Sequence, residues 1–224
     1  IVSSDMYTQY VAYFGKFKDI LSGDGSIFYS FNKSIGGNNI GLFAYYLASP
    51  LNLLLIFFPK AAIGEFIFII YLIKIGLASL CFSLYISKVY KKKDLFVVIF
   101  SLCYALMSYN ICFQMNIMWM DGMMLLPLVA LGIEEIILKG KYKLYMIVLF
   151  MVVISNYYIG YMICIFSVVY FFYKSIIYKK ISLPRTFKFF GASFITGGLA
   201  SFLLIPVLIS LSTGKADFNL FSEA

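Results

Sequence analysis

The acidic residues of this 224-residue chain are the side chains best suited to proton chemistry, because the sequence holds ten Asp and Glu residues and no histidine. The absence of histidine excludes Ser–His and Cys–His nucleophile pairs and His-ligated zinc sites. Asp121 is the most unusual of the acids, since it lies in the almost wholly apolar run QMNIMWMDGMMLLPL. An ionised carboxylate at the centre of a bilayer costs about 2.5–3.5 kcal/mol, so Asp121 either lies at an interface or has a specific task.

The composition indicates an integral membrane protein. Hydrophobic residues make up 62% of the chain and charged residues 12%, whereas about 45–50% apolar residues are usual in globular domains. The net charge of +8 comes from basic residues that cluster in short loops between apolar runs, so we expect no nucleic-acid partner. The four cysteines form no CxxC pair and are interpreted as small hydrophobic residues, not as metal ligands.

Apolar runs predict an all-α fold, a polytopic transmembrane helical bundle that makes up a single domain over residues 1–224. The predicted helices cover 61–87, 95–113, 123–138, 144–155, 157–173 and 189–211. The run 144–155 is too short to cross a bilayer alone, because a span needs about 20 residues, so we expect it to form a hairpin with 157–173. The chain lacks an initiator Met and a signal-like start, and we interpret it as a fragment of a longer membrane protein whose next exterior segment begins at 212–224.

Basic loops predict the orientation of these helices. The segments 88–93, 139–143 and 174–188 hold twelve of the eighteen basic residues, and the positive-inside rule makes their side cytoplasmic. Residues 1–60 then form a large exterior loop, and Asp121 and Trp119 lie at the outer interface.

Two features inside this topology leave alternatives open. The segment 38–60 is interrupted by Pro50, so we expect an interfacial or re-entrant element that returns to the outer side; a true span is the alternative. Lys74 lies near the middle of the helix 61–87, where it would either form an ion pair with a carboxylate or contact a lipid phosphate in an internal cavity.

Three long motifs resemble the YfhO-like family of bacterial membrane proteins. They are SGDGSIFYSFNKSIGGNNIGLFAYYLASPLNLLLIFFPK, NIMWMDGMMLLPLVALGIE and SNYYIGYMICIF, and the resemblance runs from about Asp5 to about Asp217. It implies that a first transmembrane helix and a C-terminal part are missing. It also implies the membrane-embedded, C-type glycosyltransferase fold with a large exterior first loop.

The function implied by the resemblance is sugar transfer on the outer face of the bacterial plasma membrane. The donor would be a sugar linked to undecaprenyl phosphate, a polyprenyl phosphate, and the acceptor a cell-envelope polymer such as lipoteichoic or wall teichoic acid. A lipid-linked sugar synthase and a flippase would supply the donor. Asp5, which the resemblance places directly after the missing helix, would be the catalytic base; an N-cap is the alternative role for this residue.

The resemblance and the expected outer location together suggest a set of substrate-binding residues. These are Asp121, Trp119, Asn156, Tyr157, Tyr158, Asn38, Asn39 and Lys74. Asp121 would hold the sugar, a divalent cation or the acceptor, and the Asn156–Tyr158 stretch would form a polar and stacking wall for a sugar ring. A divalent cation is compatible with this arrangement, although no acidic pair has a recognisable metal-ligand spacing.

A transporter or flippase of lipid-linked sugars is the alternative function. In that case Lys74 and the broken hairpin 144–173 would line a path across the membrane. Transporters often carry repeated halves and polar residues in several helices, whereas this sequence shows no internal repeat and its acids concentrate on the predicted outer side. We therefore favour the enzyme, with a scaffold for other envelope enzymes as a third alternative.

Overall fold

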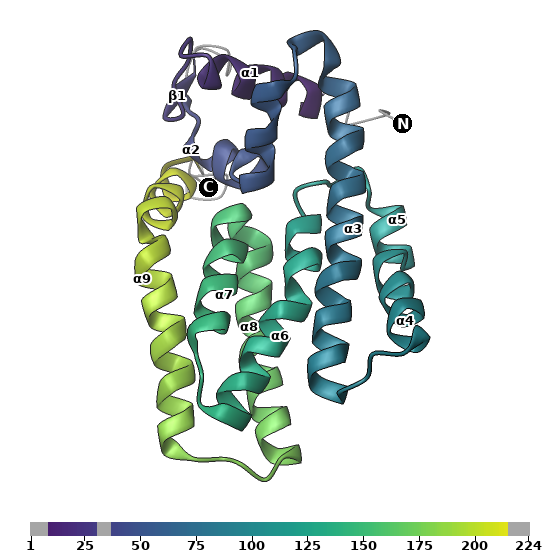
Figure 1. Ribbon diagram of the computed structural model, residues 1–224. Coiled ribbons are helices and arrows are strands. Elements are labelled where there is room, and N and C mark those ends of the chain that lie inside the picture. The colour runs from purple at the N-terminus through teal and green to yellow at the C-terminus, as the bar shows by residue number, and fades with distance from the viewer. Residues whose placement is uncertain (1–8, 31–36, 215–224) are drawn as a thin grey trace, which may run out of the picture.

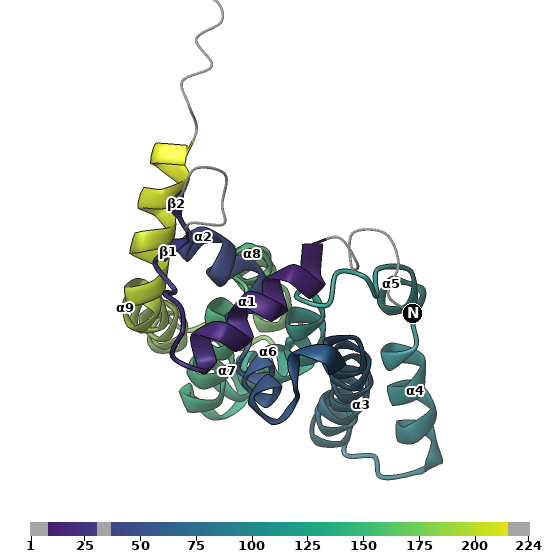
Figure 2. The same cartoon turned by 90° about the horizontal axis from the view of Figure 1, so that it is seen from above.

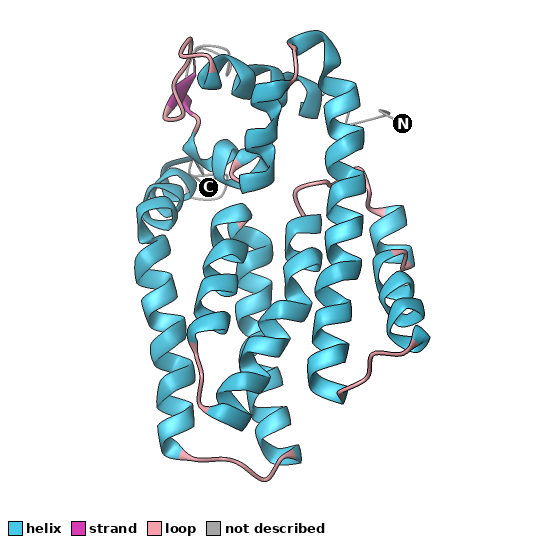
Figure 3. Cartoon of the chain, viewed as in Figure 1, coloured by secondary structure: helices cyan, strands magenta, loops and turns pink. Residues whose placement is uncertain are grey.

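The described residues of the computed structural model, 9–30 and 37–214, form an almost wholly helical molecule (Figures 1 and 3). An outer region comes first in the chain, and a bundle of helices follows it. The outer region comprises α1 (Val11–Leu21), β1 (Tyr29–Ser30), β2 (Gly37–Asn38), α2 (Ile40–Leu42), η2 (Phe43–Leu47), η3 (Pro50–Phe57) and η4 (Lys60–Ala62). The bundle comprises α3 (Ile63–Tyr90), α4 (Leu95–Ala105), α5 (Ser108–Cys112), α6 (Met120–Lys139), α7 (Lys143–Ser155), α8 (Tyr157–Ile177) and α9 (Leu183–Gly214).

Length and composition identify the helices that can cross a membrane. Four segments in the described part of the chain qualify: Lys60–Tyr90, Leu95–Cys112, Tyr157–Ile177 and Leu183–Leu211. The helix α7 is apolar but shorter than a span, as its sequence predicts. The helix α6 is 20 residues long but carries Asp121, Glu134, Glu135 and Lys139. The architecture confirms a polytopic helical membrane bundle.

With α4 and α5 taken together as one broken helix, successive bundle helices run in opposite directions, so the three basic loops lie at one end of the molecule (Figure 1). These loops follow α3, α6 and α8 and lie at the lower end in the figure. The arrangement agrees with the hairpins predicted from the apolar runs. We refer to this end as the inner end and to the opposite one as the outer end, following the positive-inside rule.

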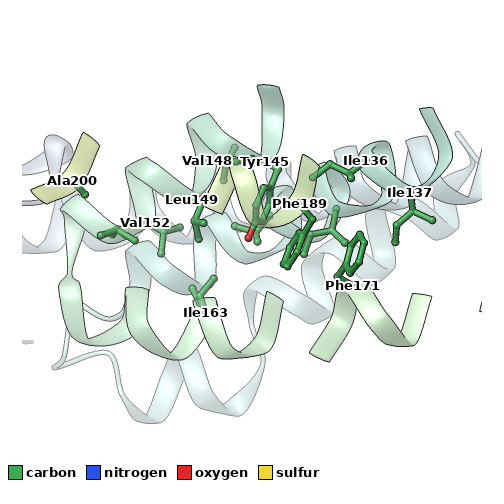
Figure 4. Packing of buried hydrophobic residues seen from close by; sticks show 14 of the residues in the cluster. Ile136, Ile137, Tyr145, Val148, Leu149, Val152, Ile163, Phe171, Phe189 and Ala200 are labelled. Atoms are coloured by element: carbon green, nitrogen blue, oxygen red, sulfur yellow. The ribbon is translucent and has the colours of Figure 1, made fainter. Parts of the chain in front are cut away.

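The helix α6 forms the centre of the bundle. It packs against α3, α7, α8 and α9, and the largest hydrophobic core joins α6 to α7, α8 and α9 (Figure 4). Gly132 permits a close approach of the α6 and α7 backbones, because a Cβ atom at this position would lie 2.6 Å from the Cα of Tyr145 on α7. The neighbouring helices thus bury Asp121 and Glu134 of α6.

The ends of two predicted helices differ in the structure. The run 95–113 breaks between α4 and α5, and Asn110 explains the break, since its Nδ2 donates to the backbone carbonyls of Tyr104 and Ala105 at the end of α4. The last helix begins at Leu183, before the predicted 189. Pro184 lies in its first turn, where the missing N–H costs nothing.

The outer region covers the outer end of the bundle. The helix α1 lies across that end (Figures 1 and 2) and buries Phe14 and Phe17 in a second hydrophobic core, shared with Phe66 and Ile70 of α3. The segments Ile40–Leu47 and Pro50–Phe57 meet at an angle of 87°. We refer to residues 40–57 as the bent segment.

The bend is compatible with both a broken span and a re-entrant loop. One backbone group at the bend is satisfied within the protein, because Asn52 Nδ2 donates to the carbonyl of Leu47 at 3.1 Å. Irregular backbone at membrane depth is tolerated only where protein or water covers it. The re-entrant assignment therefore stays a prediction, which labelling from the two sides of the membrane can test.

Candidate functional site

Four of the predicted substrate-binding residues converge on Tyr45 of the bent segment. Trp119 Nε1 donates to Tyr45 Oη at 3.1 Å, and Asn156 Nδ2 donates to the Tyr45 carbonyl at 2.8 Å. The rings of Tyr157 and Tyr158 lie 5.9 and 6.2 Å from the Tyr45 ring. We call these five residues the Tyr45 cluster. It lies at the outer end and joins the bent segment to the starts of α6 and α8.

The residues of the Tyr45 cluster differ in how far their side chains are exposed to solvent or lipid. Asn156 is buried, and its Oδ1 accepts the backbone N–H of Ile159, which caps the start of α8. Its side chain is thus fully engaged in holding the hairpin tip to the bent segment. Tyr158 is 43% exposed and Tyr157 and Trp119 are half-buried, so these aromatic faces are the ones that a ligand can reach.

A buried ion pair lies beside the Tyr45 cluster. Lys74 Nζ is 2.8 Å from Asp121 Oδ2, and the two residues are each 1% exposed. Lys74 also donates to the carbonyl of Ile117 at 2.9 Å, and Ser49 Oγ donates to Asp121 Oδ1 at 3.0 Å. The pair therefore links α3, α6 and the bent segment. Of the two alternatives for Lys74, the structure contains the ion pair with a carboxylate.

Asp121 is buried beneath the outer region, and its position relative to the membrane surface stays a prediction. Lys74 lies eleven residues into α3, which corresponds to about 16 Å along the helix axis. Because Asp121 bonds directly to Lys74, α3 extends by that length beyond the start of α6 toward the outer region (Figure 1). Contact of Asp121 with a substrate stays a prediction that requires the pair to open.

The remaining predicted residues lie apart from the Tyr45 cluster or outside the described residues. Asn38 is exposed, and its Oδ1 accepts the backbone N–H of Ile40. Asn39 is 1% exposed, and its Nδ2 has no hydrogen-bond partner among the described atoms. Asp5, the predicted base, lies outside the described residues.

A second buried polar cluster lies at the inner end of α6. Glu134 is 2% exposed and forms an ion pair with Lys174 of α8 at 2.9 Å. Tyr170 donates to the same carboxylate at 3.0 Å and bonds Tyr85 of α3 at 2.8 Å. Burial, reinforced by a hydrogen bond with Glu134, raises the pKa of Tyr178, just beyond α8, to about 12, so its phenol stays neutral at ordinary pH.

Sequence reasoning missed Tyr45, Ser49 and Glu134. Tyr45 and Ser49 carry no signal of their own, because only the 87° bend brings them to Trp119 and Asp121. Glu134 does carry a signal in the sequence, because a second acid in an apolar helix needs a buried partner. That partner, Lys174, lies in a basic segment whose pattern indicates only a loop.

Metal binding has no support in the described part of the chain. No group of three His, Cys, Asp or Glu side chains there could hold an ion. Asp121 is already paired with Lys74, and a cation has no second carboxylate beside it among the contacts of Asp121. The divalent cation stays an untested prediction.

The fold and the outer cluster define a polytopic helical membrane protein. Comparison with family models matches residues 1–223 to the bacterial membrane protein YfhO family, so the chain belongs to the YfhO family. No curated protein matches the chain. No solved structure matches it either.

Proposed function

We propose that the protein is a membrane glycosyltransferase that moves a sugar from a polyprenyl-phosphate-linked donor to a cell-envelope polymer, such as a lipoteichoic or wall teichoic acid, outside the plasma membrane. The observation that carries the proposal is the convergence of Tyr45, Trp119, Tyr157 and Tyr158 at the outer end. Aromatic faces beside polar groups suit a sugar ring, which presents C–H faces and hydroxyl edges. Membership of the YfhO family supports the membrane location.

In the proposed reaction a hydroxyl of the acceptor polymer attacks the anomeric carbon of the donor sugar. A base takes the hydroxyl proton, and the bond from the anomeric carbon to the lipid phosphate breaks, so that the phosphate leaves with the electron pair. Asp5 is the proposed base. Tyr157 and Tyr158 would orient the sugar. The Lys74–Asp121 pair and its bond to Ser49 would fix the positions of α3, α6 and the bent segment beneath the sugar.

The test replaces Asp5 by Asn in the full-length protein and measures sugar incorporation into the envelope polymer, normalised to the amount of protein in the membrane. We expect incorporation to be lost at normal abundance, with lipid-linked sugar accumulating on the outer face. Asp24→Asn is the matched control, because Asp24 is an exposed exterior carboxylate. Incorporation near the wild-type level in Asp5→Asn would refute the assignment of the base.

A transporter of lipid-linked sugars is the second candidate, and the Glu134 cluster is the observation that favours it. Asp121 and Glu134 both lie on the central helix, so buried charges occur near both ends of α6. The two functions differ in where the donor accumulates. Loss of a transferase leaves lipid-linked sugar on the outer face, whereas loss of a flippase leaves it on the inner face.

A further inference from the structure

The outer halves of α8 and α9 are separated by a long groove whose base is formed by α7. Its volume is about 540 Å³. Leu149 and Val153 of α7 form the base, and side chains of α8 and α9 form the walls. Tyr161 and Leu208 on the two walls are 66% and 64% exposed, so the groove opens sideways. Both walls belong to candidate membrane spans, and the opening therefore faces lipid.

At its inner end the groove adjoins a second hollow on α9, which shares Ser193 and Gly197 with it, and its outer end reaches the Tyr45 cluster. Phe171 of α8 and Phe189 of α9 stack with ring centroids 4.4 Å apart (Figure 4), and Tyr145 beneath the groove bonds Ser193 at 2.9 Å. At the other end Tyr157 and Tyr158 belong both to the groove and to the Tyr45 cluster. A molecule in the groove would thus have entered from the outer leaflet, with its polar end at the Tyr45 cluster.

Dimensions and chemistry indicate what the groove holds. From Ser193 to Leu211 the wall formed by α9 is about 27 Å long, at 1.5 Å per residue. A volume of about 540 Å³ spread over that length makes a narrow channel, which suits one extended chain better than two acyl chains. The described lining residues include no Asp, Glu, Lys or Arg, and the hydroxyls of Ser193 and Thr196 donate to their own helix backbone.

We infer that this groove binds the isoprenoid chain of a polyprenyl phosphate whose sugar-bearing end lies at the Tyr45 cluster. The inference rests on the proposed function, which requires a lipid-linked donor, and adds where its chain lies and from which leaflet it enters. The aromatic stack between α8 and α9 at the inner end fits a donor presented outside. A path across the membrane would have to pass the Phe171–Phe189 stack.

The first test fills the groove. Gly197 lines it, and a Cβ atom there would meet nothing within 4 Å, so the side chain of Gly197→Leu starts in open space. Gly198→Leu is the matched control, because a Cβ atom at Gly198 is equally free and Gly198 lines only the neighbouring hollow on α9, not the groove. The probe is a polyprenyl phosphate with a photoreactive group in its chain, added to the full-length protein in lipid nanodiscs.

We expect crosslinks to α8 and α9 in the wild type and in Gly198→Leu, and a drop of about tenfold in Gly197→Leu, the loss expected from displacing about two chain methylenes. Unlabelled undecaprenyl phosphate should compete with the probe, and phosphatidylglycerol should not. Equal crosslinking in Gly197→Leu, or equal competition by phosphatidylglycerol, would overturn the inference.

The second test needs no substitution. Cys164 lines the groove and is half-buried, whereas Cys103 on α4 is exposed far from it. Bound undecaprenyl phosphate should slow alkylation of Cys164 by N-ethylmaleimide and leave Cys103 unchanged. Unchanged alkylation of Cys164 would contradict the inference even if Gly197→Leu failed to fold.

Sugar transfer, measured on the same variants, separates the inference from the proposed function. Loss of both crosslinking and transfer in Gly197→Leu supports both. Crosslinking in a wild-type protein that transfers no sugar would refute the transferase and leave the lipid site standing. Wild-type transfer in Gly197→Leu without crosslinking would refute the groove as the donor site and leave the transferase standing.

Discussion

At the scale of single residues, Lys74 and Asp121 form a buried ion pair. A membrane protein can keep two such charges buried only if both are paired and hydrogen-bonded. Both side chains are nearly inaccessible, and Ser49 and the Ile117 carbonyl supply further hydrogen bonds. Two ions buried together can be nearly neutral for stability, but removing one leaves the other without a partner. The pair is therefore best understood as a coupling between elements.

A double-mutant cycle tests that coupling. Lys74→Met and Asp121→Asn should each destabilise the protein by about 3–5 kcal/mol, because each leaves one buried ion unpaired. The double variant should be less destabilised than the sum of the two, since it removes both charges and keeps an acceptor for Ser49. Thermal unfolding in detergent measures all four proteins.

The exposed pair Lys60–Asp19 provides the control for this cycle. Its side chains are 59% and 39% exposed, so Lys60→Met should change stability by only about 0–1 kcal/mol. Additive losses in the Lys74 and Asp121 cycle would contradict the coupling and would indicate that the two residues act independently.

At the scale of elements, the packing of α6 on α7 depends on Gly132. The atoms that a Cβ would meet are the backbone N and Cα of Tyr145, which cannot rotate away. Gly132→Ala should therefore lower stability by about 1–3 kcal/mol through overpacking, despite the better helix propensity of alanine. The measurement is again thermal unfolding of the purified protein.

Gly76→Ala on α3 isolates the propensity effect. No atom lies within 4 Å of the Cβ that this variant adds, so it should be neutral or stabilise the protein by up to about 1 kcal/mol. If Gly132→Ala behaved like Gly76→Ala, the close approach of α6 and α7 would not limit stability.

Elements were more predictable than contacts. Apolar runs and basic loops located the bundle helices, with α4 and α5 predicted as one run, because burial in lipid imposes long uninterrupted hydrophobic stretches. The break at Asn110 was missed, since it depends on one side chain that competes for backbone carbonyls. The sequence predicts four residues of the Tyr45 cluster: Trp119, Asn156, Tyr157 and Tyr158. Their contacts with Tyr45 depend on the bend of the bent segment, which no local sequence pattern predicts.

At the scale of the whole molecule, the orientation and the bent segment can be tested together. A single cysteine at Asp24 or Lys60 should react with a membrane-impermeant maleimide in intact cells, because a re-entrant 40–57 places both positions outside. Cysteines at Lys92, Lys141 and Lys180 in the basic loops should react only after the membrane is permeabilised. Labelling at only one of the positions 24 and 60 would show that the bent segment spans the membrane.

The polarity of α6 leads to a prediction about its insertion. Tested alone in a microsomal insertion assay with glycosylation reporters, α6 should insert poorly, since Asp121 and the Glu134–Glu135 pair each add a cost of up to about 2.5–3.5 kcal/mol. A longer segment that includes α3 should insert better, and Lys74→Met should remove part of that gain. Efficient insertion of α6 alone would contradict this.

The central position of α6 therefore bears on how the protein is made. When the ribosome delivers Asp121 to the membrane, Lys74 has already been synthesised, but Lys174 and the shielding helices α7, α8 and α9 have not. The most polar helix of the bundle must consequently be retained beside the translocation channel, or by α3, until its later neighbours emerge. The order in which the helices are synthesised therefore affects how α6 is inserted and how the bundle folds.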